Sequence, residues 1–273
     1  MGWKSAIAHW SLAGITGLLL SGLMVLDQRE VWSQSKTRLT AYVQKNFRSI
    51  AHEQERILRI RHIGLPRVRI GFDSIDDLIL AEEAHANGAY NPYTDEVWLN
   101  YESVTYPLHG LWGRLGLYSA GRMTADDALR HELGHYFADK RSEAMGRGSW
   151  PSNVIAAAAA CASPPCGLDA DFTKEKLLMR LVSEGIGRWF ESNGRERDTF
   201  SYDELPADPW TIDPIADKPV FYRAGLHLVK PILDRYRARG VDYLVTHLPR
   251  VDSLRDLPRY QQEALRVLRE GTP

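Results

Sequence analysis

Apolar positions in the first part of the chain follow two different patterns. From Ser5 to Leu26, 22 residues contain no Asp, Glu, Lys or Arg, and as a helix this run would span roughly 33 Å, the thickness of a bilayer's hydrocarbon core. From Ser35 to Arg61 the apolar side chains recur at helical spacing, as in an amphipathic helix. Pro66 ends that second region.

Alternating patterns then predict a small sheet. Val68, Ile70 and Phe72 alternate with polar residues, as in a half-buried strand. The segment 88–100 holds two short β-prone runs around a turn of Asn, Pro, Thr and Asp, which is typical of a hairpin. A short helix over 76–86 is expected between these strands.

Helical periodicity dominates the rest of the chain. Thr124 is a good N-cap, and Asp127 three residues later gives a pattern close to a capping box. We expect helices at about Ala125 to Lys140, Thr173 to Asn193, Pro219 to Gly240 with a kink near Pro231, Val241 to Leu248, and Leu257 to Glu270. The fold class is therefore α+β and predominantly helical, with the sheet towards the N-terminal side.

These patterns divide the chain into a membrane anchor over 1–33, a helical stalk or linker over 34–66, and a main domain over 67–273. A cleaved signal peptide and a buried core helix are the alternatives for the apolar run. The length of the run and the charged stretch 27–30 argue against a signal peptide. We expect residues 5–26 to lie in the lipid bilayer as a single-pass helix, which predicts a membrane protein.

Composition narrows the set of partners. The 273 residues carry 34 basic and 35 acidic side chains, so the net charge is −1 and nucleic acid is not an expected partner. Cys161 and Cys166 enclose a short turn-prone loop, and a disulfide between them would favour an extracytoplasmic domain. Two free thiols are the alternative. Metal ligation by this pair alone is disfavoured, because no further Cys or His lies close in sequence.

The pattern H-E-x-x-H at residues 131–135 carries the clearest chemistry. His131 and His135 are four residues apart, so on a helix both imidazoles can reach one zinc ion at about 2.0–2.1 Å. Glu132 would lie near the open coordination position, where it can take a proton from the metal's water and return it to the leaving amine. The alternative is a solvated helix face with two incidental histidines, which the mid-helix position behind a good cap disfavours.

This pattern resembles the signature of the zincin superfamily of metallopeptidases. The metzincin branch would need Gly at 138 and His at 141, whereas this chain has Ala138 and Arg141. The segment 182–191 resembles the downstream helix of gluzincins, in which a Glu is the third ligand. The resemblance implies a zincin-like fold, in which the active-site helix packs against a small sheet and further helices. It also implies one catalytic zinc ion held by His131, His135 and Glu184.

Glu184 is favoured on physical grounds as well. It is expected in mid-helix beside apolar positions, where an unpaired carboxylate would be costly. Gly185 and Gly187 each cost about 1 kcal/mol against Ala in a helix, so a close approach to the His131 helix is expected there. The alternative for Glu184 is a surface ion pair with Arg180 or Arg188.

One position departs from the best-known gluzincins. Those enzymes carry an Asp four residues after the ligand Glu to orient a histidine, and this chain has Arg188 there, so that carboxylate is unidentified.

Other acidic residues are weaker candidates for the third ligand. Glu175 and Glu191 are expected near the helix ends and solvated, with Glu143 and Asp171 as remote possibilities.

Substrate contacts are predicted from the same resemblance. Either 97–99 or 89–90 could bind extended substrate by strand addition, with an ordinary sheet strand as the alternative. Tyr222 is the preferred donor to the oxyanion and His227 the second choice, while a hydrogen-bonded core tyrosine is the alternative.

The sequence therefore predicts a membrane-anchored zinc metallopeptidase acting on a peptide or protein. The alternatives are a catalytically silent zincin-fold binding protein tethered to the membrane and a zinc hydrolase of a non-peptide amide.

Overall fold

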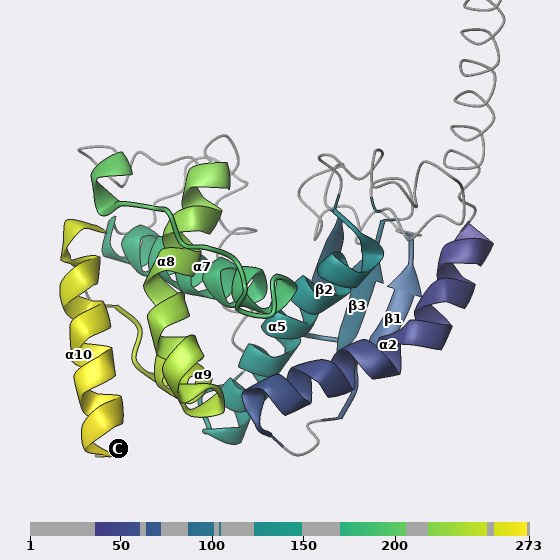
Figure 1. Cartoon of the computed structure of the whole chain (residues 1–273), viewed down its shortest axis with the longest axis horizontal. Coiled ribbons are helices and arrows are strands. Elements are labelled where there is room, and N and C mark those ends of the chain that lie inside the picture. The colour runs from purple at the N-terminus through teal and green to yellow at the C-terminus, as the bar shows by residue number, and fades with distance from the viewer. Residues whose placement is uncertain are drawn as a thin grey trace, which may run out of the picture.

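The computed structural model describes residues 36–60, 64–71, 87–100, 104, 123–148, 170–205, 218–249 and 254–271. The described part is α+β and mostly helical, with one small sheet, as predicted (Figure 1). The expected anchor at 5–26, the helix over 76–86 and the Cys161–Cys166 pair lie outside these residues. None of the helices that the structure describes has both the length and the hydropathy needed to cross a bilayer.

The sheet has three described strands, β1 (Arg67–Ile70), β2 (Gly88–Asn91) and β3 (Glu96–Leu99). Their order is β1-β3-β2, with β1 parallel to β3 and β2 antiparallel to it. The hairpin expected over 88–100 is confirmed, and Tyr90 pairs with Val97 in its register. Because β3 is hydrogen-bonded on both sides, its residues 97–99 cannot add a substrate strand, so that half of the prediction is wrong. Among the described strands, β2 is the one at the edge beside the α5 helix.

The helices are α2 (Lys36–Leu58), α5 (Ala125–Ala144), α7 (Ala170–Glu191), α8 (Lys218–Tyr236), α9 (Ala238–Thr246) and α10 (Leu257–Glu270), with short 3-10 turns at Tyr202–Glu204 and Leu254–Asp256. Helix α5 is central, because it contacts β2 and β3, α2, α7 and α9 (Figure 1). Helix α8 packs against α7, and α10 packs against α8 and α9. The histidine helix thus joins the sheet to the helical half of the molecule.

Local signals explain where the ligand-bearing helices begin and end. The Thr124 side chain accepts a hydrogen bond from the backbone N–H of Asp127, which caps α5 as predicted, and the helix continues to Ala144. Helix α7 ends before Asn193 and Gly194, both in the left-handed region at φ 53° and 69°. Leu129, Leu133 and Phe137 of α5 are fully buried, so this helix belongs to the core.

The two helices predicted over 219–240 and 241–248 are both present, but the boundary between them lies earlier than predicted. Helix α8 continues past Pro231 and ends at Tyr236, and Arg237, at φ 53°, turns the chain into α9. The predicted end at Gly240 is therefore wrong. A residue in the left-handed region of backbone conformation interrupts an α-helix. The residue type at Arg237 does not predict that conformation.

Candidate metal centre

Three side chains from two helices converge as the sequence predicted. His131 and His135 of α5 and Glu184 of α7 offer ligand atoms that all lie within 4.8 Å of one another. The Nε2 atom of His131 lies 3.3 Å from Oε2 of Glu184, and Nε2 of His135 lies 3.9 Å from the same oxygen. Both imidazoles therefore direct the same nitrogen at one carboxylate oxygen. These three residues could hold a metal ion.

The donor set fits zinc. In a tetrahedral site with bonds of about 2.0–2.1 Å, two ligand atoms lie roughly 3.3 Å apart, close to the distances between these nitrogens and the oxygen. Two histidines and one glutamate give three protein ligands, which is the pattern of catalytic sites that keep a fourth position open.

The remaining nitrogen of each histidine has a partner that orients the ring. Nδ1 of His131 lies 3.3 Å from Oε2 of Glu191, and Nδ1 of His135 lies 3.0 Å from the hydroxyl of Ser183. Such contacts fix the imidazole and the tautomer that leaves Nε2 free for a metal. The prediction that Glu191 is solvated is wrong, because only 12% of its side chain is exposed.

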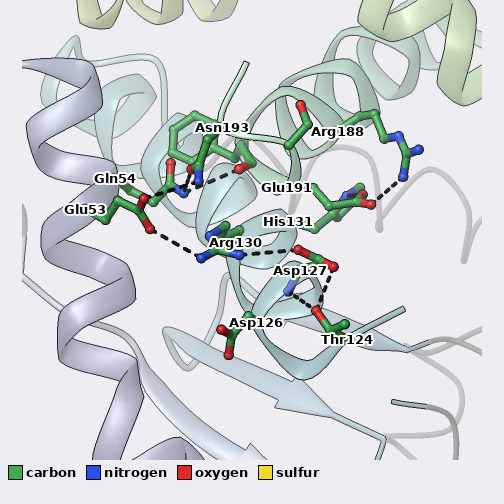
Figure 2. A network of polar contacts seen from close by, with 12 residues as sticks. Glu53, Gln54, Thr124, Asp126, Asp127, Arg130, His131, Arg188, Glu191 and Asn193 are labelled. Atoms are coloured by element: carbon green, nitrogen blue, oxygen red, sulfur yellow. Dashed lines mark hydrogen bonds and ion pairs between the residues drawn. The ribbon is translucent and has the colours of Figure 1, made fainter. Parts of the chain in front are cut away.

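Glu191 and Ser183 are residues of the candidate centre that the sequence did not predict. A signal for Glu191 existed, since it follows Glu184 by seven residues, which is two helical turns on the same face. Glu191 is also held by Arg188 (Figure 2). Arg188 in turn contacts Glu196 at 2.9 Å. A carboxylate in contact with His131 therefore lies three residues beyond Arg188, at Glu191.

Glycines allow α7 to approach both neighbouring helices. A Cβ on Gly187 would lie 2.6 Å from Nε2 of His131, and one on Gly134 would lie 3.0 Å from the Cα of Gly187. The close approach predicted from Gly187 is thus confirmed. Gly185 instead faces α8, where its Cβ would lie 2.3 Å from the backbone oxygen of Gly225. The expectation that Gly185 also serves the His131 helix is therefore wrong.

Burial and neighbouring charges shift the pKa values of the two histidines in opposite directions. Burial by itself would lower the pKa of His131, but hydrogen bonds with Glu184 and Glu191 outweigh it and raise the pKa to about 10. Burial lowers the pKa of His135 to about 4. Burial would raise the pKa of Glu184, but the hydrogen bond from His131 and the neighbouring positive charges hold it well below its usual range. Without a metal, the centre therefore holds one imidazolium against an ionised carboxylate.

Glu132 lies between this centre and the sheet. Its side chain is buried at 6% exposure, and its Cγ lies 3.2 Å from the position that a Cβ on Gly88 would take at the start of β2. Its charge contributes to the raised pKa values of both His131 and Tyr222. A carboxylate beside the histidines and beside an edge strand is placed to exchange protons with a group bound there.

Of the two predicted oxyanion donors, α8 brings Tyr222 to the centre. Its ring stacks on that of His131 with centroids 5.7 Å apart, and its hydroxyl is hydrogen-bonded to Glu184. Burial and the charge of Glu184 raise the pKa of Tyr222 well above its ordinary value, so the hydroxyl keeps its proton. His227 instead pairs with Asp198 at 2.6 Å, away from the metal group.

A polar network outside the centre holds the ligand helices in place. Arg130, next to His131, contacts Glu53 of α2 and Asp127 of α5, each at 3.3 Å (Figure 2). Gln54 of α2 donates a hydrogen bond of 2.6 Å to Asn193, directly after α7. Helix α2 thereby contacts both the helix that carries the histidines and the residues that follow the helix of Glu184.

Comparisons with protein-family models, with curated proteins and with solved structures found no match for this chain. The class that the fold and the site define is therefore an α+β protein whose central helix and its neighbour form a His-His-Glu group able to bind a metal.

Proposed function

We propose that this chain is a zinc-dependent metallopeptidase of the gluzincin-like type, anchored to a membrane by residues 5–26. The observation that supports it most directly is the convergence of His131, His135 and Glu184 within 4.8 Å. Glu132 lies beside this group, and β2 provides an edge strand among the described residues. These are the parts that hydrolysis of an extended peptide requires.

The residues divide the chemistry between them. Zinc, when bound by the three ligands, polarises the peptide carbonyl and makes water easier to deprotonate. Glu132 accepts the proton of the attacking water and passes it to the leaving amine. The Tyr222 hydroxyl, which keeps its proton because its pKa is raised, donates a hydrogen bond to the oxygen on which negative charge develops. The backbone of β2 at Ala89 and Tyr90 aligns the substrate by strand pairing.

Three variants test this proposal. Purified wild-type protein is expected to contain about one zinc ion per chain and to cleave members of a peptide library, with activity abolished by chelator. Glu132→Gln is expected to keep the metal and lose hydrolysis, and His131→Ala to lose both. Arg195→Gln is the matched control, because its side chain is exposed and outside the centre.

Two outcomes would favour the alternatives. Zinc bound without cleavage of any peptide would favour a silent binding protein, and cleavage confined to non-peptide amides would favour a different hydrolase. A metal-free wild type, with His131→Ala indistinguishable from it, would overturn the proposal.

The location of the domain needs its own experiment. The anchor and the extracytoplasmic placement of the domain rest on the pattern of residues 5–26 and on Cys161 and Cys166. Fractionation of the full chain with membranes, followed by protease protection, is expected to leave the domain accessible from the extracytoplasmic side. Recovery of the full chain in the soluble fraction would contradict the anchor.

A further inference from the structure

A cation adjoins the candidate metal group without a hydrogen-bonding partner among the described residues. Arg180 lies one turn before Glu184 on α7, and its Nε is 3.9 Å from Oε1 of that carboxylate. This separation allows an ion pair but is too long for a hydrogen bond, and the guanidinium makes no hydrogen bond to any part of the chain that the structure describes. Arg188 differs, since both Glu191 and Glu196 accept hydrogen bonds from it.

The side chain of Arg180 is more exposed to solvent than those of the three candidate ligands. The exposed fraction of the side chains is 6% at His131, 12% at His135, 14% at Glu184 and 26% at Arg180. The charge of Arg180 also acts on His135 and on Tyr222. The guanidinium therefore lies beside a candidate ligand and is partly accessible to solvent.

A metal bound to Glu184 would reduce the negative charge that balances Arg180. Glu184 directs Oε2 at the two histidines and Oε1 at Arg180, so a metal held through Oε2 would share the charge that now balances the guanidinium. The unused N–H groups form a planar fork that matches a carboxylate bidentately. An anionic group of the substrate would balance the positive charge of Arg180 and accept hydrogen bonds from its N–H groups.

We propose that Arg180 binds a carboxylate of the substrate close to the scissile bond, and that the enzyme therefore prefers peptides with a negative charge at that point. This inference rests on the proposed peptidase function. The carboxylate has two sources, the free C-terminus of a short peptide or the side chain of an acidic residue. A C-terminal carboxylate would make the enzyme remove residues from the end of a chain.

Matched peptide pairs separate these sources. One pair has the same sequence with a free C-terminus or a C-terminal amide, and a second pair exchanges Glu for Gln at each position around the cleaved bond. Wild-type kcat/KM is expected to be at least about tenfold higher for the charged member of one pair. Arg180→Gln is expected to remove that preference mainly through KM, so that the ratio of kcat/KM between the charged and the neutral member falls to about one. Arg195→Gln, an exposed arginine, is the control for loss of charge alone.

A binding measurement keeps the inference testable without turnover. Calorimetry on zinc-loaded Glu132→Gln, with and without Arg180→Gln, is expected to show tighter binding of the charged peptide only when Arg180 is present. Arg180→Lys keeps the charge but not the fork, and it is expected to show an intermediate preference with zinc content unchanged. Equal treatment of charged and neutral peptides by the wild type, or a preference that survives Arg180→Gln, would overturn the inference. Absence of zinc and of all cleavage would instead count against the peptidase function itself.

Discussion

Gly187 lies directly against the metal-facing nitrogen of His131. A Cβ at position 187 would be 2.6 Å from Nε2, closer than any carbon and nitrogen can pack. Helix α7 therefore brings Glu184 to the histidines only because its next turn carries no side chain at this point. The packing of two helices and the geometry of the ligands depend on the same residue.

Gly187→Ala is expected to displace the His131 imidazole and to weaken zinc binding by at least about tenfold. The measurement is competition with a chromophoric chelator at constant pH. Gly64→Ala is a matched control, because its added Cβ would lie at an ordinary 3.5 Å from the Tyr136 hydroxyl. Unchanged affinity in Gly187→Ala would show that His131 does not bind the metal through Nε2.

Glu191→Gln is expected to weaken zinc binding by about 10–100-fold while the protein stays folded. The amide keeps the shape of the side chain but removes the charge that holds Nδ1 of His131. Glu196→Gln is the matched control, since Glu196 shares the Arg188 partner and has no contact with His131 among the described residues. Equal losses in the two variants would assign the effect to Arg188 instead.

Tyr222→Phe is expected to lower kcat by about 10²–10³-fold and to leave the zinc content unchanged. The hydroxyl adjoins Glu184 and keeps its proton. Its removal would therefore take away the hydrogen-bond donor to the oxygen on which negative charge develops. Tyr202→Phe serves as the control, because the Tyr202 hydroxyl is buried with no hydrogen-bond partner in the described structure and its ring packs against His227. A Tyr222→Phe variant with full kcat would leave Tyr222 as a core residue only.

The two histidines are expected to titrate far apart in the metal-free protein. His131 should keep its proton until about pH 10, and His135 should stay neutral down to about pH 4. The raised pKa of His131 means that its ion pairs stabilise the folded metal-free protein fully below the ordinary pKa of 6.5 and that this contribution is lost as the pH rises through about 10. NMR titration of the ring protons in chelator-treated protein measures both values. Two histidines that both titrate near pH 6.5 would contradict the buried ion pair.

Local signals were enough to locate much of the fold and most of the candidate site. The cap at Thr124, the hairpin over 88–100 and the helix Leu257–Glu270 depend on neighbouring residues, so their sequence signals are read within a few positions. The pair His131 and His135 was likewise predicted from residues that are close in sequence, because the two histidines are four positions apart on one helix. The one long-range member, Glu184, was predicted from the resemblance of 182–191 to the gluzincin helix, and it was favoured because a carboxylate among apolar helix positions requires a partner.

Relationships between elements could not be predicted in this way. Whether β3 is central or at the edge depends on β1, which pairs with it from a distant part of the chain. Gly185 and Gly187 give the same signal in sequence, yet one serves α8 and the other α5, because helix positions two residues apart point in different directions.

The sequence by itself determined the helix periods, the capped helix with H-E-x-x-H and the acidic residue that completes a His-His-Glu group. Only the tertiary structure decided that Glu191 and Ser183 orient the imidazoles, that Tyr222 rather than His227 reaches the centre, and that Arg180 adjoins the carboxylate without a hydrogen bond. The physical reason is that a helix offers neighbours at fixed spacing along its own axis. The rotation that sets which of its faces meets another helix is fixed only when the whole core packs.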